Sequence, residues 1–155
     1  MKKTILFLSM ISPAIGLATP SNNTYFELGG NAAGYSLNYE RYFTDNDIGF
    51  RIGAGCIWEG NYVALGAPVM LNKLWGNPAS NHKLETGFGT TYFSASKRSK
   101  LFDFDRNNNI FMGTASVGYK YIPKSGGITF KAAFTPIFNQ DVFLPWMGFS
   151  VGHSF

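Results

Sequence analysis

Three carboxylates and three cations are the residues of this 155-residue sequence best suited to chemistry in a confined space. They are Glu27, Glu40, Glu85, Arg51, Lys120 and Lys131. Ion pairs of this kind are costly to bury singly but tolerable when each charge is paired and hydrogen-bonded. The same groups could instead pass protons or ions from one to the next. The six therefore predict either an ion-paired, packed interior or a polar path through one.

Catalysis and metal binding have weaker support in the sequence. It contains two histidines, His82 and His153, and one cysteine, Cys56. His153 and Ser154 are neighbours on an expected strand, so their side chains point to opposite faces and cannot form a nucleophile–base pair. Two distant histidines without further cysteines do not match a zinc site. We therefore predict no catalytic residue, no metal ligand and no cofactor.

The elements that must position these residues are β-strands. In AAGYSLNYERYF, as in most of the chain, apolar residues alternate with small or polar ones, which is the period of a strand. The pattern predicts eight strands, at 24–31, 33–43, 48–58, 62–75, 82–93, 110–121, 128–138 and 146–155. Pro68 and Pro136 lie within them and predict bulges or local breaks in the strand pairing.

The first residues predict export. MKK is a short basic segment, and the apolar stretch at 4–18 ends in small residues, as a signal peptide does. We expect a signal peptide at 1–18 and one domain at 19–155. An uncleaved membrane helix is the alternative, but Pro13 interrupts a segment shorter than the ~20 residues that a spanning helix needs. The net charge of +4 includes Lys2 and Lys3, so it gives no indication of nucleic-acid binding.

The polar face of the strands indicates whether a barrel formed by them would be soluble or would lie in a membrane. Gly, Ser, Thr and Asn dominate it, and only 14% of the chain is charged, against about a quarter in a typical soluble domain. A soluble, lipocalin-like barrel is the alternative, but it would need more charge on its water-exposed face. Small side chains suit the narrow lumen of eight strands, and the apolar face suits lipid. We predict an all-β fold, an eight-stranded antiparallel up-and-down transmembrane β-barrel, whose closure satisfies the backbone polar groups.

This pattern resembles the small outer-membrane β-barrels of the OmpA/OmpX type. The phrase YFELGGNAAGYSLNYERYF resembles the opening hairpin of a small outer-membrane barrel family common in Bacteroidota. The resemblance implies a bacterial outer-membrane location and a last strand read by the barrel-assembly machinery. The residues of that implied assembly signal are Phe149, Val151, His153 and Phe155, with His153 where the family usually has Tyr or another hydrophobe. No ligand or catalytic residue follows from it.

Strand register places the charges and the connections. If 44–47 is a turn, Phe43 lies opposite Ile48, and Glu40 lies directly opposite Arg51 on the lumen side. By the same alternation Glu27, Glu85, Lys120 and Lys131 also point inward. With both termini in the periplasm, the connections near 31–33, 59–61, 94–109 and 139–145 are extracellular.

The longest of these connections, 94–109, holds the candidate surface contacts. They are Lys97, Arg98, Lys100, Asp103 and Asp105. The cations could bind lipopolysaccharide phosphates. The acidic part spaces oxygen ligands two apart but lacks the Gly and the later Glu of an EF-hand, so we expect a solvated loop. The sequence does not identify an extracellular partner.

These observations predict a non-enzymatic outer-membrane barrel, structural or surface-interacting, with a closed, ion-paired lumen. A narrow ion-conducting pore is the alternative. A lipid A-modifying barrel enzyme is weaker, because such enzymes place their histidine near the outer rim and both histidines here are expected at the periplasmic end.

Overall fold

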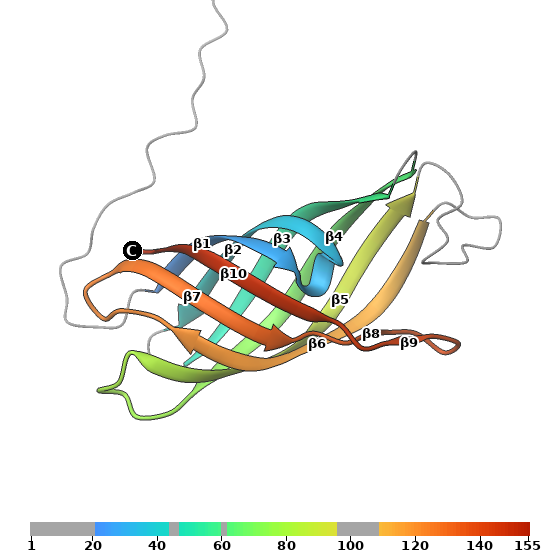
Figure 1. Cartoon of the computed structure of the whole chain (residues 1–155). Helices are drawn as coiled ribbons and strands as arrows, with labels where there is room; N and C mark the ends of the chain where they lie inside the picture. Colours follow the sequence, from blue (N-terminus) through green and yellow to red (C-terminus); the bar gives the residue numbers. More distant parts are fainter. Residues whose placement is uncertain (1–20, 44–46, 60–61, 96–108) are drawn as a thin grey trace, which may run out of the picture.

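The computed structural model describes residues 21–43, 47–59, 62–95 and 109–155, which form a closed antiparallel β-barrel (Figure 1). Its long strands are β1 (Asn22–Gly29), β2 (Gly34–Phe43), β3 (Ile48–Glu59), β4 (Tyr62–Trp75), β5 (His82–Ala95), β6 (Asn109–Tyr121), β7 (Gly127–Phe134) and β10 (Met147–Ser154). The chain also forms η1 (Gly30–Ala32), β8 (Ile137–Phe138) and β9 (Phe143–Leu144). Each long strand pairs with its neighbour in the chain, and the β1–β10 pairing closes the ring. The predicted eight-stranded barrel is confirmed.

Two groups of predictions lie outside the described residues. The signal peptide at 1–18 is one group. The candidate surface contacts Lys97, Arg98, Lys100, Asp103 and Asp105 are the other. Both stay predictions.

The two faces of the wall differ as the alternation predicted. Leu37, Leu71, Phe88 and Phe111 are 64–69% exposed on the outside. Inward residues such as Thr114 are fully buried. An apolar exterior around a polar interior suits a barrel surrounded by lipid. In water, the same exterior would be a large exposed apolar surface, which soluble proteins rarely have. Within the described ranges, no helix is long and apolar enough to cross a bilayer.

The predicted breaks at the two prolines are present in different forms. Pairing between β3 and β4 lapses from Ile52–Val69 to Gly55–Gly66, beside Pro68, but the register is the same on both sides, so no residue is inserted. At Pro136, β7 ends and β8 begins, and both pair with β6 in one register. Proline has no N–H to donate to a ladder, which explains the interruptions.

The predicted loop at 139–145 contains one short strand, β9. β8 and β9 continue the β7–β10 hairpin, and the turn closes where Asn139 N donates to Val142 O at 2.9 Å. The Asn139 side chain accepts from Asp141 N at 2.9 Å and from Val142 N at 2.7 Å, as turn asparagines do. The hairpin therefore projects at the end of the barrel opposite the C-terminus (Figure 1).

The predicted connection at 31–33 joins β1 and β2, but it does not project from the barrel as a loop. Instead, η1 folds into the barrel, and Gly30, Asn31 and Ala32 are buried. Gly29, Gly30 and Ala33 have φ values of 76°, 68° and 63°, which reverse the chain inward. Glycine adopts such values at little cost, and a pattern of alternating residues cannot reveal this turn.

Candidate functional site

A network of charged side chains fills the barrel interior. All six charged residues that the alternation placed inside are at most 5% exposed. They are Glu27, Glu40, Glu85, Arg51, Lys120 and Lys131. They come from six different strands, β1, β2, β3, β5, β6 and β7, that surround one lumen, so their mutual contacts decide what the interior can do.

Glu85 on β5 is the centre of one half of the network. Its Oε2 atom lies 2.8 Å from Lys120 Nζ on β6, and its Oε1 atom pairs with Lys131 Nζ on β7. The Tyr42 hydroxyl donates to the same carboxylate at 2.8 Å. Three donors around one buried carboxylate keep its charge satisfied.

Glu40 on β2 shares Lys120 with Glu85. Lys120 Nζ forms an ion pair with Glu40 Oε2, and Asn72 Nδ2 donates to the other oxygen at 2.6 Å. The lysine also donates to the Tyr42 hydroxyl at 3.1 Å. This group balances two carboxylates with Lys120 and Lys131, which is the arrangement in which buried charges are tolerated.

Arg51 on β3 organises the second group. Its guanidinium donates to the Tyr25 hydroxyl at 3.0 Å and to Asn31 of η1, and it lies 3.8 Å from Glu27 Oε1. Asn31 in turn donates to Ala115 O at 2.9 Å. Arg51 therefore holds η1 in the lumen, a contact that the sequence did not reveal.

The predicted register is confirmed, but the two opposite side chains do not form an ion pair with each other. Glu40 pairs with Arg51 in the β2–β3 ladder, as counted from the turn. The two side chains nevertheless form ion pairs with other residues, Glu40 with Lys120 and Arg51 with Glu27. Long side chains in a narrow lumen reach the opposite wall, so the register does not determine the partner.

Glu27 is the least satisfied charge of the network. It is fully buried, and neither carboxylate oxygen has a hydrogen-bond partner in the part of the chain that the structure describes. The backbone at Gly30 packs directly against the carboxylate, where a Cβ atom would overlap it. The ion pair with Arg51 is therefore its main compensation.

Among the described residues, one interior charge was missed. Lys83 on β5 is 4% exposed, and its Nζ atom donates to Asn77 O at 2.9 Å. It is two residues from Glu85, so the same alternation that placed Glu85 inside would have placed Lys83 there as well. Lys83 lies beside the turn between β4 and β5, where a backbone carbonyl takes the place of a carboxylate partner.

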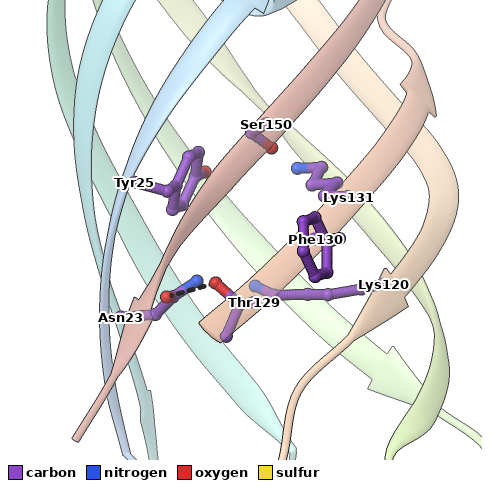
Figure 2. Close-up of a pocket in the computed structure, with 7 residues that line it drawn as sticks. All are labelled: Asn23, Tyr25, Lys120, Thr129, Phe130, Lys131 and Ser150. Carbon is purple, nitrogen blue, oxygen red and sulfur yellow. Dashed lines mark hydrogen bonds between the residues drawn. The ribbon is translucent and has the colours of Figure 1, made fainter. Parts of the chain in front are cut away.

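The interior around these charges is packed. Figure 2 shows the space lined by Asn23, Tyr25, Lys120, Thr129, Phe130, Lys131 and Ser150, which has no room for a water molecule. Thr129 Oγ1 donates to Asn23 Oδ1 there at 3.0 Å. Toward the end of the barrel that carries η1, an apolar cluster fills the lumen, formed by Ala33, Ala64, Phe93, Met112 and Ile137. The charges thus lie within a packed core.

The histidines lie on the outside of the wall. His82 Nδ1 and the Tyr119 hydroxyl are 2.6 Å apart. The His153 ring stacks on Phe155 at 6.5 Å, while Ser154 points inward and is buried. In the part of the chain that the structure describes, no group of three His, Cys, Asp or Glu residues could hold a metal ion.

The residues of the implied assembly signal share one outward strip. Phe149, Val151 and Phe155 are 41–57% exposed, and His153 is exposed between them. Their recognition during assembly stays a prediction.

Comparison with known proteins identifies the fold. No family model and no curated protein matches the chain. The structure is similar to the N-terminal β-barrel domain of Pseudomonas aeruginosa OprF, with a TM-score of 0.66 and 16% identity, covering 86% of this chain and 95% of that one. It is also similar to the Yersinia pestis outer membrane protein Ail, with a TM-score of 0.52 and 14% identity, covering 89% and 99%.

The chain therefore has the fold of the small eight-stranded outer-membrane β-barrels. This is the class that the OmpA/OmpX-type resemblance implied. The narrower resemblance to a Bacteroidota family stays a prediction, because identities this low show the fold alone.

Proposed function

We propose that this protein is a non-enzymatic barrel of the bacterial outer membrane, closed to solutes, that acts as a structural or surface-interaction protein. One observation carries the proposal: the charges of the lumen are bound to one another in a packed interior. Lys120 bridges Glu40 and Glu85, and Arg51 ties η1 to Glu27. Side chains used in this way hold the barrel shut.

The apolar exterior and the two outer-membrane structures of the same fold support the location. Figure 1 shows the β4–β5 and β6–β7 turns at the same end as the C-terminus, and the β8–β9 hairpin at the other end. We place the first end in the periplasm, since bacterial barrels have short periplasmic turns. The 96–108 segment then connects β5 and β6 on the extracellular side.

The proposed contacts follow from that orientation. Lys97, Arg98 and Lys100 would meet lipopolysaccharide phosphates, and Asp103 and Asp105 would face the medium. The barrel-assembly machinery would be the partner during biogenesis. We propose no cofactor and no nucleic-acid partner.

Single-channel recording of the purified, refolded protein in a planar bilayer tests the closed lumen. We expect no steady conductance, because Lys120 and Lys131 are paired with Glu85 and the space beside them has no room for a water molecule. Heat-modifiable mobility in the same preparation verifies that the barrel is folded. A steady wild-type conductance would contradict the proposal.

A narrow ion-conducting pore is the second candidate. Lys120 already contacts two carboxylates, so an exchange between them could open a path. If this function is correct, single-channel recordings of the wild type show brief openings. Lys120→Met should abolish those openings, because the methionine cannot exchange between the two carboxylates. A matched change outside the lumen, Leu71→Ala, should leave the recording unchanged.

A further inference from the structure

The wall of the barrel has a notch where the β1–β2 hairpin ends. β1 stops at Gly29 and β2 starts at Gly34, because η1 folds inward between them. On one side β3 continues to Glu59, and on the other the β8–β9 hairpin extends beyond β10. Figure 1 shows both flanks reaching further than η1 along the barrel.

This notch forms a groove of about 340 Å³. Its lining comes from both faces of the wall. Leu28, Tyr35, Trp58, Met147 and Phe149 are 50–76% exposed on the outside. Ile57 and Trp146 alternate with those residues and approach from the lumen side. Because residues of both faces line it, the groove crosses the end of the wall. Its volume is within the range of small-molecule sites, about 300–1,000 Å³.

One described residue that lines the groove, Trp146, has a polar group without a partner. The indole Nε1 of Trp146 is buried and has no hydrogen-bond acceptor among the described residues. It lies beside Gly29, where the wall ends. Buried indole N–H groups usually find an acceptor. None of the described residues that line the groove is charged, so a neutral acceptor on an apolar molecule suits it.

We propose that the groove holds one acyl chain of an outer-leaflet lipid, whose ester or amide carbonyl accepts a hydrogen bond from the Trp146 indole when the ring turns toward the groove. The groove opens onto the apolar exterior that lipid covers, so a chain reaches it without leaving the membrane. The aromatic rings of Tyr35 and Trp58 flank its outer mouth at the level where lipid headgroups meet chains. This inference rests on the proposed orientation in the outer membrane.

Quenching of tryptophan fluorescence by brominated lipids tests the proposal. The variant W58F/W75F leaves Trp146 as the single tryptophan, and the matched control W58F/W146F leaves Trp75. Trp75 is 47% exposed on the outer wall and donates to Thr86 at 2.8 Å, so lipid should reach it in any case. Both proteins are refolded into phosphatidylcholine vesicles whose chains carry bromine near the carbonyl end or near the methyl end.

We expect bromine near the carbonyl end to remove most of the Trp146 emission, and bromine near the methyl end to remove less. If Trp75 is quenched and Trp146 is not, the chain site is overturned while the membrane barrel stands. If neither is quenched, the protein is not embedded, and the proposed function fails as well. The two failures are therefore distinguishable.

Nuclear Overhauser effects from the Trp146 indole proton identify the occupant of the groove. We expect cross-peaks to the acyl methylene protons next to the lipid carbonyl. Cross-peaks to water alone would mean a hydrated groove. Cross-peaks that depend on protein concentration would mean a second copy of the chain. Either result would overturn the proposal.

Discussion

Lys120 lies between Glu40 and Glu85 and forms an ion pair with each of them. The three residues belong to β6, β2 and β5. β5 and β6 are paired neighbours, whereas the Lys120–Glu40 contact joins two strands that are not neighbours in the wall. An interaction across the lumen resists both flattening and opening of the barrel. We therefore expect the loss of this contact to lower the free energy of unfolding more than the loss of any other contact in the network.

Lys120→Met should destabilise the barrel, because it leaves Glu40 and Glu85 short of one cation. Removing one partner of a fully buried pair costs about 3–5 kcal/mol, and water entering the lumen would reduce that cost. Urea unfolding in phospholipid vesicles, followed by tryptophan fluorescence, measures the free energy of unfolding.

A double-mutant cycle separates this pair from its neighbours. Glu40→Gln combined with Lys120→Met should show a coupling of about 0.5–3 kcal/mol, as contacting residues do. Glu40→Gln combined with Arg51→Met should be closer to additive, because these two side chains pair with other residues. The opposite ranking would mean that Glu40 pairs with Arg51 after all.

Glu40 and Arg51 also show which features of the barrel could be predicted from the sequence. Alternation and the turn at 44–47 were sufficient to predict the eight long strands, the inward face and the β2–β3 register, because a strand has a period of two and a turn sets the count. They could not predict which charges meet. That depends on the barrel's closure and on side-chain reach across the lumen, which sequence spacing does not encode.

Two other features show different limits. Lys83 was within reach of the same alternation, since it is two residues from Glu85. The inward fold of η1 was not, because it depends on left-handed conformations at Gly29, Gly30 and Ala33 and on hydrogen bonds to strands far away in the chain. The notch beside Trp146 exists because η1 folds inward, so the sequence could not predict the notch either.

Gly30→Ala should destabilise the barrel and loosen η1. The residue has a φ of 68°, and its new Cβ atom would overlap the Glu27 carboxylate. A non-glycine residue in a sparsely populated backbone region costs of order 1–3 kcal/mol, and the overlap adds to it. Urea unfolding gives the stability, and hydrogen exchange of the Asn31 amide gives the local effect.

Gly127→Ala is the control for this prediction. Gly127 also has a positive φ, 123°, but nothing lies within 4 Å of the position its Cβ atom would take. We expect it to cost less than Gly30→Ala and to leave exchange at Asn31 unchanged. Equal losses in the two variants would show that the contact with Glu27 is unimportant.

Phe155→Ala should lower the amount of protein in the outer membrane and leave unfolded protein in the periplasm. This substitution isolates the aromatic ring from the backbone, because Phe155 N donates to Asn22 O at 3.0 Å and Asn22 N donates to Phe155 O at 3.2 Å. Deleting the residue would remove the ring and both hydrogen bonds together. Membrane fractionation and heat-modifiable mobility measure the outcome.

Phe155→Tyr serves as the matched variant and should restore normal levels, since it keeps an aromatic ring at the end of the strand. If Phe155→Ala assembles as well as the wild type in cells, the ring is not part of an assembly signal. If it fails in cells but also fails to refold in detergent, the ring acts on stability instead.

Accessibility of the two ends of the barrel tests the orientation. In a Cys56→Ser background, a cysteine at Asp141 should react with an impermeant maleimide on intact cells, whereas a cysteine at Ser125 should not. Asp141 is exposed in the turn of the β8–β9 hairpin, and Ser125 is exposed in the turn between β6 and β7, at the other end. Both positions should react once the cells are permeabilised, which verifies that each thiol is accessible. If only Ser125→Cys is labelled on intact cells, the orientation of the barrel is the opposite of the one proposed. The 96–108 segment would then face the periplasm, and the notch beside Trp146 would open to the inner leaflet.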